Sequence, residues 1–301
     1  MAEQLVAYGS RLGIYYAEED SWGVLGSAPT VYRLRATDFG IQLGRDNFTT
    51  NELRGNRQKS DVRLGMFNVS GDIPIEFSYG SFDDLLESLF FNTWSSAGTL
   101  EVGDTQKSFT IQRSFLDIGE HHAFSGCVVN SFSLSIAPNS MVTGTFSFIG
   151  KDMALTETLT NPIDKSTSSP FDSFTGTIKE GGTTIAIVTG LDITINNNID
   201  PLQVVMNNKP VGLGEGDCDV NGTLTAYFDS SSLLQKFVNE TVSSLEITLT
   251  DLNSNSYTIY IPKIKYTGGE VATSGSNSPV TLSLPFMGLY DDTYSIIQIT
   301  R

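Results

Sequence analysis

Apolar and polar side chains alternate along several short stretches of the chain. Residues 131–136, 191–196 and 245–250 each carry a large apolar side chain at every second position. Successive side chains of a β-strand point to opposite faces, so this alternation predicts antiparallel strands with one buried face and one solvated face. The solvated positions are mostly Ser and Thr, which is typical of the exposed face of a β-sandwich.

Two stretches follow a helical period instead. Each places five residues at i, i+3, i+4, i+7 and i+8, which form one face of a helix. Ser81 and Asp229 precede them and are the expected N-caps. Helices this short are marginal alone, so we expect each to pack on a sheet. The faces consist of Phe82, Leu85, Leu86, Leu89 and Phe90 in the first helix, and of Ser230, Leu233, Leu234, Phe237 and Val238 in the second.

The order of these elements recurs within the chain. A block over residues 34–150 returns, loosely, over residues 189–288, with the two helices as its clearest landmark. The repeat predicts two similar units, since two repeats are too few for a solenoid. Four further landmarks match in order: residues 39–43 with 191–195, 100–102 with 245–247, 109–111 with 257–259, and 140–150 with 278–288.

The expected fold is all-β with one short helix per repeat, arranged as two tandem β-sandwich or barrel domains. Residues 1–30 form an N-terminal arm whose aromatic side chains suit docking onto a neighbouring copy. The first domain covers residues 31–154 and the second covers residues 174–301. The Pro-, Ser- and Thr-containing stretch between them, residues 155–173, is expected to be the linker.

Net charge narrows the possible partners. The chain of 301 residues carries a formal charge of −16, which argues against a surface that binds nucleic acid tightly, since such binding depends on neutralising phosphates. The acidity favours solubility, and it also permits the wall of a channel through which DNA passes without sticking. No apolar run is long enough to span a bilayer, so we expect no membrane partner. Without a secretion signal, Cys127 and Cys218 are expected to be free thiols.

A long polar loop follows the first strand of each repeat, and the two loops differ in charge. Residues 45–63 carry five basic and three acidic side chains, a net of +2, whereas residues 197–217 carry one and three, a net of −2. Long loops in compact domains are often functional, so we expect these loops to reach neighbouring copies, with a mobile surface excursion as the alternative. The candidates for contacts between subunits or rings are Arg45, Arg54, Arg57, Lys59, Arg63, Lys209, Glu215, Tyr15 and Tyr16.

Catalytic chemistry is missing from the sequence. His121 and His122 are adjacent, so on a strand they would face opposite sides and could not easily share a metal. Asp83 and Asp84 open a predicted helix, where acidic side chains favour the macrodipole. No phosphate-binding or nucleophile motif is present. We therefore expect no catalytic residue, no metal and no cofactor.

Five segments of the chain together resemble a known family. They are residues 9–13, 27–29, 70–75, 82–91 and 144–151, in that order. The pattern is similar to that of the tail tube (major tail) proteins of long-tailed bacteriophages, most strongly over residues 7–151 and more weakly beyond. These motifs describe β-structure rather than a chemical signature, and the family has no catalytic residues to transfer.

The resemblance implies a structural virion protein with two tail-tube-like domains. Members form rings closed by a 24-stranded barrel, and the rings stack into the hollow tube that holds the tape-measure protein and later conducts DNA. Tail terminator and baseplate or distal tail proteins would bind its ends, and the protein would reside in the virion tail after assembly in the host bacterial cytoplasm. Most members have one domain and form hexamers, so the duplication here predicts a trimeric ring with pseudo-sixfold symmetry. A ring of six copies is the expectation if the second half is only a decoration.

Such a tube requires side chains that line its lumen without retaining DNA. Hydroxyl and amide groups can be wet without holding phosphate, whereas clustered Lys or Arg would bind it. The lumen candidates are Ser131, Ser133, Ser135, Thr194, Asn196 and Thr248. The helix residues expected to pack on the opposite, outer face of the sheet are Leu85, Leu86, Leu89, Leu233, Leu234 and Phe237.

Two other function classes remain open at this point. A two-domain β-sandwich binding module, such as an adhesin or carbohydrate binder, would present aromatic platforms in its loops. Trp22 and Trp94 are the only tryptophans, and neither lies in an evident loop cluster. An enzyme with an unfamiliar β-fold would need titratable groups that converge in a pocket.

Overall fold

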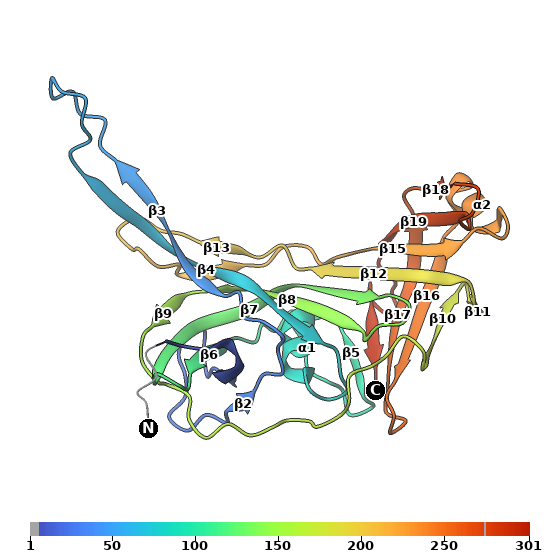
Figure 1. Ribbon diagram of the computed structural model, residues 1–301, viewed down its shortest axis with the longest axis horizontal. Coiled ribbons are helices and arrows are strands. Elements are labelled where there is room, and N and C mark those ends of the chain that lie inside the picture. The colour runs from blue at the N-terminus through green and yellow to red at the C-terminus, as the bar shows by residue number, and fades with distance from the viewer. Residues whose placement is uncertain (1–5, 274) are drawn as a thin grey trace.

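The computed structural model describes residues 6–273 and 275–301, so the first five residues of the expected arm lie outside the described part. Within it, the chain is mostly antiparallel β-structure with two short α-helices (Figure 1). All strands except the short pair β13 and β14 are hydrogen-bonded into one large sheet. The prediction of a mostly β protein with two helices is confirmed, and the helices and strands have the following bounds.

The first half of the chain holds one 3₁₀-helix, nine strands and one α-helix. In chain order these are η1 (Gly9–Arg11), β1 (Leu12–Glu18), β2 (Tyr32–Arg33), β3 (Gln42–Thr49), β4 (Val62–Glu76), α1 (Asp83–Phe90), β5 (Thr99–Glu101), β6 (Phe109–Phe115), β7 (Glu120–Ile136), β8 (Thr143–Gly150) and β9 (Asp152–Ala154).

The second half holds eleven strands and one α-helix. In chain order these are β10 (Gly176–Glu180), β11 (Thr183–Thr184), β12 (Val188–Asn196), β13 (Asp200–Leu202), β14 (Gly212–Gly214), β15 (Asp219–Tyr227), α2 (Ser232–Val238), β16 (Ser243–Thr250), β17 (Ser256–Tyr266), β18 (Glu270–Ala272), β19 (Thr281–Gly288) and β20 (Gln298–Thr300).

Strand pairing follows the same order in the two halves. The first half pairs as β1–β6–β7–β8–β4–β3, and the second as β10–β16–β17–β19–β15–β12. Even an irregularity recurs: the β6–β7 register shifts between Phe109 and Ile111, and the β16–β17 register shifts between Ser243 and Leu245. The order of hydrogen bonding thus repeats along the chain.

The pairing corrects two of the expected landmark matches. Because β6 occupies the position of β16, residues 109–111 correspond to 243–245 rather than to 257–259. Residues 100–102 overlap β5, which pairs with β20 and has no counterpart in the second half. Alternating apolar strands look alike in sequence, and only the partner of each strand distinguishes them.

The two halves meet edge to edge. Residues 131–136 of β7 pair with residues 191–196 of β12, so the layer continues from one half into the other as β3–β4–β8–β7–β12–β15–β19–β18 (Figure 1). We call this the eight-stranded layer. A second junction joins β20 to β5. Two ladders of backbone hydrogen bonds therefore hold the halves together.

The apolar face of the eight-stranded layer carries the core. Phe132 and Phe146 stack at 4.4 Å between ring centroids, and Phe82, at the start of α1, lies 6.0 Å from Phe146. Leu85, Leu86 and Leu89 of α1 are all buried in this cluster. Burial of a leucine stabilises a fold by roughly 1.5–3 kcal/mol, so α1 is fixed by packing rather than by helix propensity.

The helices differ from expectation in two respects. The N-cap of α1 is Phe82 and that of α2 is Ser231, and neither makes a side-chain capping bond, so the predicted N-caps Ser81 and Asp229 are wrong. Ser81 instead bonds Ser78, with 2.7 Å between hydroxyl oxygens. In α2 no residue is fully buried, although Leu233, Leu234 and Phe237 are half-buried against the core.

The expected N-terminal arm is built into the first half over its described residues. β1 pairs with β6 along its whole length. Tyr16 is only 1% exposed, and its hydroxyl donates to Asp84 at 3.1 Å; Tyr15 is also buried. Tyr16 packs in the main core, whereas Tyr15 packs in a separate small cluster with Val31 and Leu159, so both side chains are occupied within the chain.

The segment expected as a linker, residues 155–173, is docked along the first half. Phe171 is fully buried, and its N–H donates to the carbonyl of Phe77 at 2.8 Å. Arg35 donates to the carbonyl of Ser168 at 2.7 Å. The segment connects the halves as a strap fixed to one of them, with its path set by backbone hydrogen bonds.

A buried polar cluster reinforces the contact between the halves. Tyr257 of β17 and Arg301 both donate to the carboxylate of Asp83 in α1, while the N–H of Gly80 donates to the Tyr257 hydroxyl at 2.9 Å. Burial raises the pKa of Tyr257, and the charge of Asp83 raises it further. Arg301 also covers the ring of Trp94 at 4.4 Å. The cluster therefore joins residues that are distant in sequence.

We expect Tyr257→Phe to lower the free energy of unfolding by about 1–3 kcal/mol, because it removes a donor to a buried carboxylate and the acceptor of a backbone N–H. The measurement is urea denaturation of the unassembled chain. Tyr260→Phe, on the same strand, is the control, since its hydroxyl makes no hydrogen bond within the described residues. Equal stability of the two variants would contradict a stabilising role for the cluster.

Candidate assembly surfaces

The solvated side of the eight-stranded layer is lined by small polar side chains. Cross-strand pairing places one row of them directly opposite one another, from Thr145 through Ser133 and Thr194 to Asn221. We call this side the hydroxyl face. Its exposed or half-buried polar members include Gln42, Ser70, Asp72, Glu76, Ser131, Ser133, Ser135, Thr143, Thr145, Ser147, Asp192, Thr194, Asn196, Asp219, Asn221, Thr223, Thr225, Glu270, Thr281 and Ser283, and the exposed Tyr227 and Met287 lie among them.

The hydroxyl face brings together five of the six sequence-derived lumen candidates. Ser131, Ser133 and Ser135 face Asn196, Thr194 and Asp192 across the junction between the halves. Thr248 lies outside the eight-stranded layer, on β16, where it pairs with Thr177 of β10 and Thr258 of β17; we call β10, β16, β17 and β20 the other layer. Its strand alternates in the same way, but alternation alone does not tell which layer a strand joins.

The charges of the hydroxyl face have one sign. Its five charged side chains, Asp72, Glu76, Asp192, Asp219 and Glu270, are all carboxylates. Two of them accept short hydrogen bonds from neighbouring hydroxyls, Ser147 to Asp72 and Ser135 to Asp192, both at 2.6 Å. A surface of hydroxyls and carboxylates offers no cation to a phosphate backbone, so it would not retain nucleic acid.

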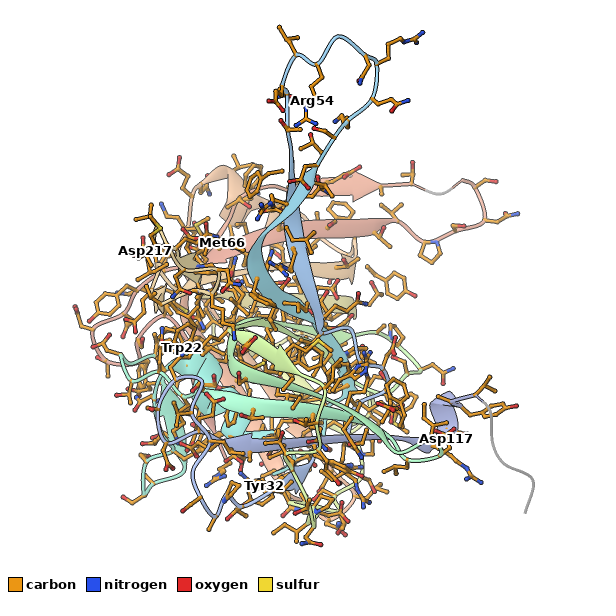
Figure 2. The ribbon with its side chains drawn as sticks, turned by 90° about the vertical axis from the view of Figure 1, so that its left-hand side faces the viewer. Trp22, Tyr32, Arg54, Met66, Asp117 and Asp217 are labelled. Atoms are coloured by element: carbon orange, nitrogen blue, oxygen red, sulfur yellow. The ribbon has the colours of Figure 1, made fainter. Side chains whose placement is uncertain are left out.

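The β3–β4 hairpin projects beyond the rest of the molecule (Figure 2). Its tip carries Arg54, Arg57 and Lys59, and Arg63 lies at the start of β4. Arg54 forms an ion pair with Glu52 at 2.6 Å, and Arg63 forms one with Asp61 at 3.4 Å; both ion pairs are exposed to solvent. Leu53 at the tip is 100% exposed. The tip therefore presents an exposed apolar side chain beside exposed charged side chains.

Arg45 lies at the base of this hairpin rather than at its tip. Its guanidinium sits 4.6 Å from the centre of the Phe67 ring and donates to the carbonyl of Gly65 at 3.0 Å. Long side chains held this way cover apolar surface. Arg45 therefore shapes the hairpin from within the chain.

The corresponding loop of the second half lies down on the first half. Lys209 forms an ion pair with Asp152 of β9, and the N–H of Phe67 donates to the carbonyl of Asn208 at 2.8 Å. Glu215, beyond the β13–β14 pair, stays exposed. The two long loops, both expected to reach neighbouring copies, therefore differ in the structure. The β3–β4 hairpin projects from the molecule, whereas residues 197–217 are bonded to the first half of their own chain.

Nothing in the described residues assembles a reaction centre. No group of three or more His, Cys, Asp or Glu side chains there could hold a metal ion. His121 and His122 have separate partners, Ser114 at 3.0 Å and Arg113 at 2.9 Å, and burial together with Arg113 lowers the pKa of His122. Acid–base chemistry needs groups that converge on one point, and these do not.

The two cysteines are free, as predicted. Cys127 is buried, and burial raises the pKa of its thiol. Burial also raises the pKa of Cys218 to about 11. Burial thus favours the protonated thiol over the nucleophilic thiolate at both positions.

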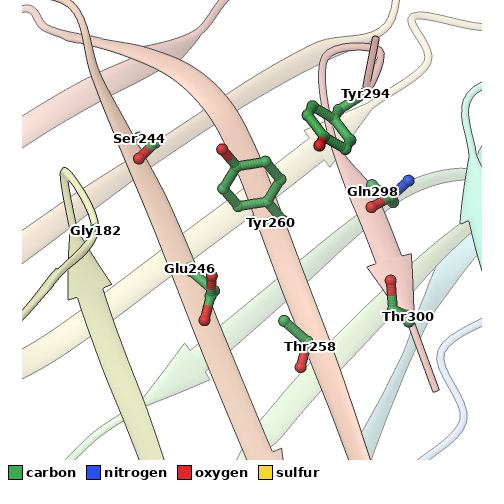
Figure 3. A pocket seen from close by; sticks show the side chains of 8 residues that line it. All are labelled: Gly182, Ser244, Glu246, Thr258, Tyr260, Tyr294, Gln298 and Thr300. Atoms are coloured by element: carbon green, nitrogen blue, oxygen red, sulfur yellow. The ribbon is translucent and has the colours of Figure 1, made fainter.

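A shallow polar hollow lies on the other layer of the second half, over β16, β17 and β20 (Figure 3). Its one carboxylate, Glu246, is paired with Lys179 at 2.6 Å. Tyr260 and Tyr294 meet edge to face at its rim, with 5.4 Å between ring centroids. Hydroxyl and amide groups make up most of the remaining lining, which gives the hollow no nucleophile–base pair.

The tryptophans do not form an exposed aromatic platform. Trp22 donates from its indole nitrogen to the carbonyl of Gly126 at 2.9 Å, and Lys151 lies over its ring. Trp94 stacks on Tyr257, with 6.0 Å between ring centroids. Both rings are held within the fold, so neither tryptophan supplies the aromatic platform expected of a carbohydrate-binding module. No described helix is long and apolar enough to cross a membrane.

The sequence model of the phage tail tube protein family matches residues 9–288, a span that includes both halves of the chain. No match was found among curated protein sequences. The family match decides between the tail component and the alternatives of an adhesin or an enzyme. The chain belongs to the phage tail tube protein family, whose members are structural, non-enzymatic components of the virion tail.

Proposed function

We propose that three copies of this chain close into a ring with pseudo-sixfold symmetry. In this proposal residues 31–154 and 174–301 are tandem tube domains, residues 155–173 connect them, and β1 completes the first. The observation that carries the proposal is the β7–β12 pairing, which joins two halves of equal strand order into one layer. A trimer would contribute three layers of eight strands, and therefore the 24 strands of a closed tube.

The hydroxyl face is proposed to line the lumen. Supporting this, the opposite face of the same strands packs against α1 and the core, so only one side is free to face a channel. Its carboxylates would repel the phosphates of passing DNA, and its hydroxyls would hydrate it without holding it. The tape-measure protein would occupy the same space before DNA does.

The β3–β4 hairpin is proposed to contact the next ring of the stack. Its support is the projection of the tip and the combination of exposed Leu53 with Arg54, Arg57 and Lys59. An acidic chain offers many carboxylates as counterparts. Contacts of this kind set register and orientation more than affinity. Tail terminator and distal tail proteins would meet the same surfaces at the two ends.

Purified protein examined by negative-stain electron microscopy is expected to form rings or hollow rods whose averages show threefold symmetry with six similar lobes. Native mass spectrometry of isolated rings should give three times the chain mass of 32.7 kDa. Rings of six chains would contradict the tandem-domain proposal, and a chain that stays monomeric at all concentrations would contradict tube formation itself.

Arg54→Glu combined with Arg57→Glu is expected to leave a folded ring that stacks poorly, because it reverses the charge of the hairpin tip without touching the core. Single exposed pairs contribute about 0–1 kcal/mol, but the tip repeats around the ring. Tube length in electron micrographs is the measurement.

Arg33→Glu is the matched control for this pair of changes. Its side chain is 54% exposed, against 52% for Arg54, and it pairs with Asp164 at 3.5 Å away from the hairpin. Tubes of wild-type length from the hairpin variant would show that the tip makes no contact between rings.

Ser133→Lys combined with Asn221→Lys is expected to make tubes retain DNA, because six cations then enter each trimeric ring on the hydroxyl face. Tubes assembled with short duplex DNA and treated with nuclease should protect DNA only in this variant, with protection decreasing as salt rises. The control Thr177→Lys places its cation on exposed β10. Equal protection by the control would refute the proposed lumen wall.

A further inference from the structure

The eight-stranded layer ends in an open edge on each side. β3 pairs with β4 alone, and β18 pairs with β19 alone, among the described residues. Unpaired strand edges present backbone donors and acceptors that favour pairing with another strand. The two edges lie at opposite ends of the layer, so a single copy cannot satisfy one with the other.

The junction between the halves shows how two edges of this kind pair within one chain. β12 and β7 pair antiparallel over six residue pairs, from Leu191 opposite Ile136 to Asn196 opposite Ser131. The ladder extends one step further, where the N–H of Asn197 donates to the carbonyl of Asn130 at 2.8 Å. This junction is therefore a template for the contact that the open edges lack.

The pairing identifies β3 as the counterpart of β12. The row Gln42–Ser70–Ile149 repeats as Thr194–Asn221–Met287. Ile149 and Met287 each precede the glycine that ends its strand, Gly150 or Gly288. Gln42 thus occupies the position that Thr194 holds at the junction.

The pairing also identifies β18 as the counterpart of the end of β7. Ser133 faces Thr145, and Glu270 faces Ser283. Thr145 and Ser283 lie at equal distances before the glycines that end β8 and β19. Glu270 thus occupies the position of Ser133, the residue that faces Thr194 across the junction.

We propose that residues 40–42 of one copy, which lead into β3, pair antiparallel with β18 of the next copy in the register of the β7–β12 junction. This inference rests on the proposed ring and specifies its contact between subunits. The register places Gly40 opposite Ala272, Ile41 opposite Val271, and Gln42 opposite Glu270. The occupant of each open edge is a second copy of this chain, since its counterpart edge is carried at the other end of the same layer.

Backbone directions agree with this register on the β3 side. The N–H of Gly40 donates to the carbonyl of Asp72 in β4 at 2.8 Å. Because successive residues of a strand direct their backbone groups to opposite sides, those of Ile41 point away from β4. They are available to a neighbouring strand.

The same argument applies on the β18 side. The N–H of Phe228 donates to the carbonyl of Val280 at 2.9 Å, so alternation along β15 and β19 directs Thr281 and Ser283 toward β18. Their partners Ala272 and Glu270 face β19, and the backbone groups of Val271 point outward. Ile41 and Val271 would therefore form the hydrogen-bonded pair.

The side chains at the paired positions are also compatible with the proposed register. Val271 is 40% exposed, and Ile41, its proposed neighbour, is fully buried on the core side. Pairing would cover Val271 in the way that Leu134 is covered beside Ile193 at the template junction. On the hydroxyl face the amide of Gln42 would meet the carboxylate of Glu270, a favourable cross-strand pair.

A cysteine pair tests the register. Gln42 and Glu270 would form a non-hydrogen-bonded pair, whose Cα atoms lie about 4.5 Å apart and whose side chains lie closest. Mild oxidation of assembled Gln42→Cys/Glu270→Cys protein should give disulfide-linked dimers and trimers, and nothing larger, on a non-reducing gel. The single variants control for bonds to Cys127 and Cys218.

Two further pairs serve as matched controls. Ser133→Cys/Thr194→Cys reproduces the template junction and should form a bond within one chain. Gln42→Cys/Ala272→Cys is two residues out of register, at about 7–8 Å, and should not cross-link. Rings that form without cross-linking at 42 and 270, or that cross-link better at 42 and 272, would overturn the register and leave the proposed ring intact. A chain that forms the 133–194 bond but no rings would overturn both.

Val271→Pro is a second test that leaves the fold in place. It removes an N–H that faces the open edge, and proline is tolerated at edge positions of this kind. Thermal melting of the monomer should match wild type, while rings are lost. Normal rings from Val271→Pro would overturn the proposed junction.

Discussion

The structure depends on one constraint: the backbone groups along the edge of a β-sheet need a partner. Within this chain the constraint is met where β12 pairs with β7, and that ladder makes one layer of two halves. The β5–β20 ladder and the cluster around Asp83 reinforce the same contact. Because the halves share one strand order, the edges left over at β3 and β18 are of the kind that the internal junction joins.

The register of that junction has consequences on both faces of the layer. Side chains alternate with a period of two, so a slip of one residue would drive Ser133 into the core and expose Leu134. The register that buries Phe132 and Phe146 is therefore the register that keeps hydroxyls together on the other face. Burial of the core and the proposed lumen wall therefore require the same register, and a change of register would alter both faces together.

Much of this could be predicted from sequence where the signal is local. Alternation identified Ser131, Ser133, Ser135 and Thr194 as solvated, and the helical period identified Leu85 and Leu89 as buried. Long-range pairing was harder: Thr248 alternates as they do but belongs to the other layer, and Tyr16 is buried because β1 pairs with the distant β6. The two long loops differ in that the second is bound to the first half by the ion pair between Lys209 and Asp152, and sequence spacing does not predict this pair.

Duplication changes the energetics of closing a ring. Each association of free subunits costs translational and rotational freedom, by estimates of about 4–15 kcal/mol. In a ring of six single domains every junction forms between separate chains. In the proposed trimer three of the six junctions are the internal β7–β12 ladder, formed on folding at the high effective concentration of a linked pair. The docked strap of residues 155–173 limits that freedom further, since it holds the first half by Phe171 and Arg35. In this proposal a duplicated chain would close its ring with fewer association steps, and its two corresponding loops would be free to diverge, one bound internally and the other meeting a neighbouring copy.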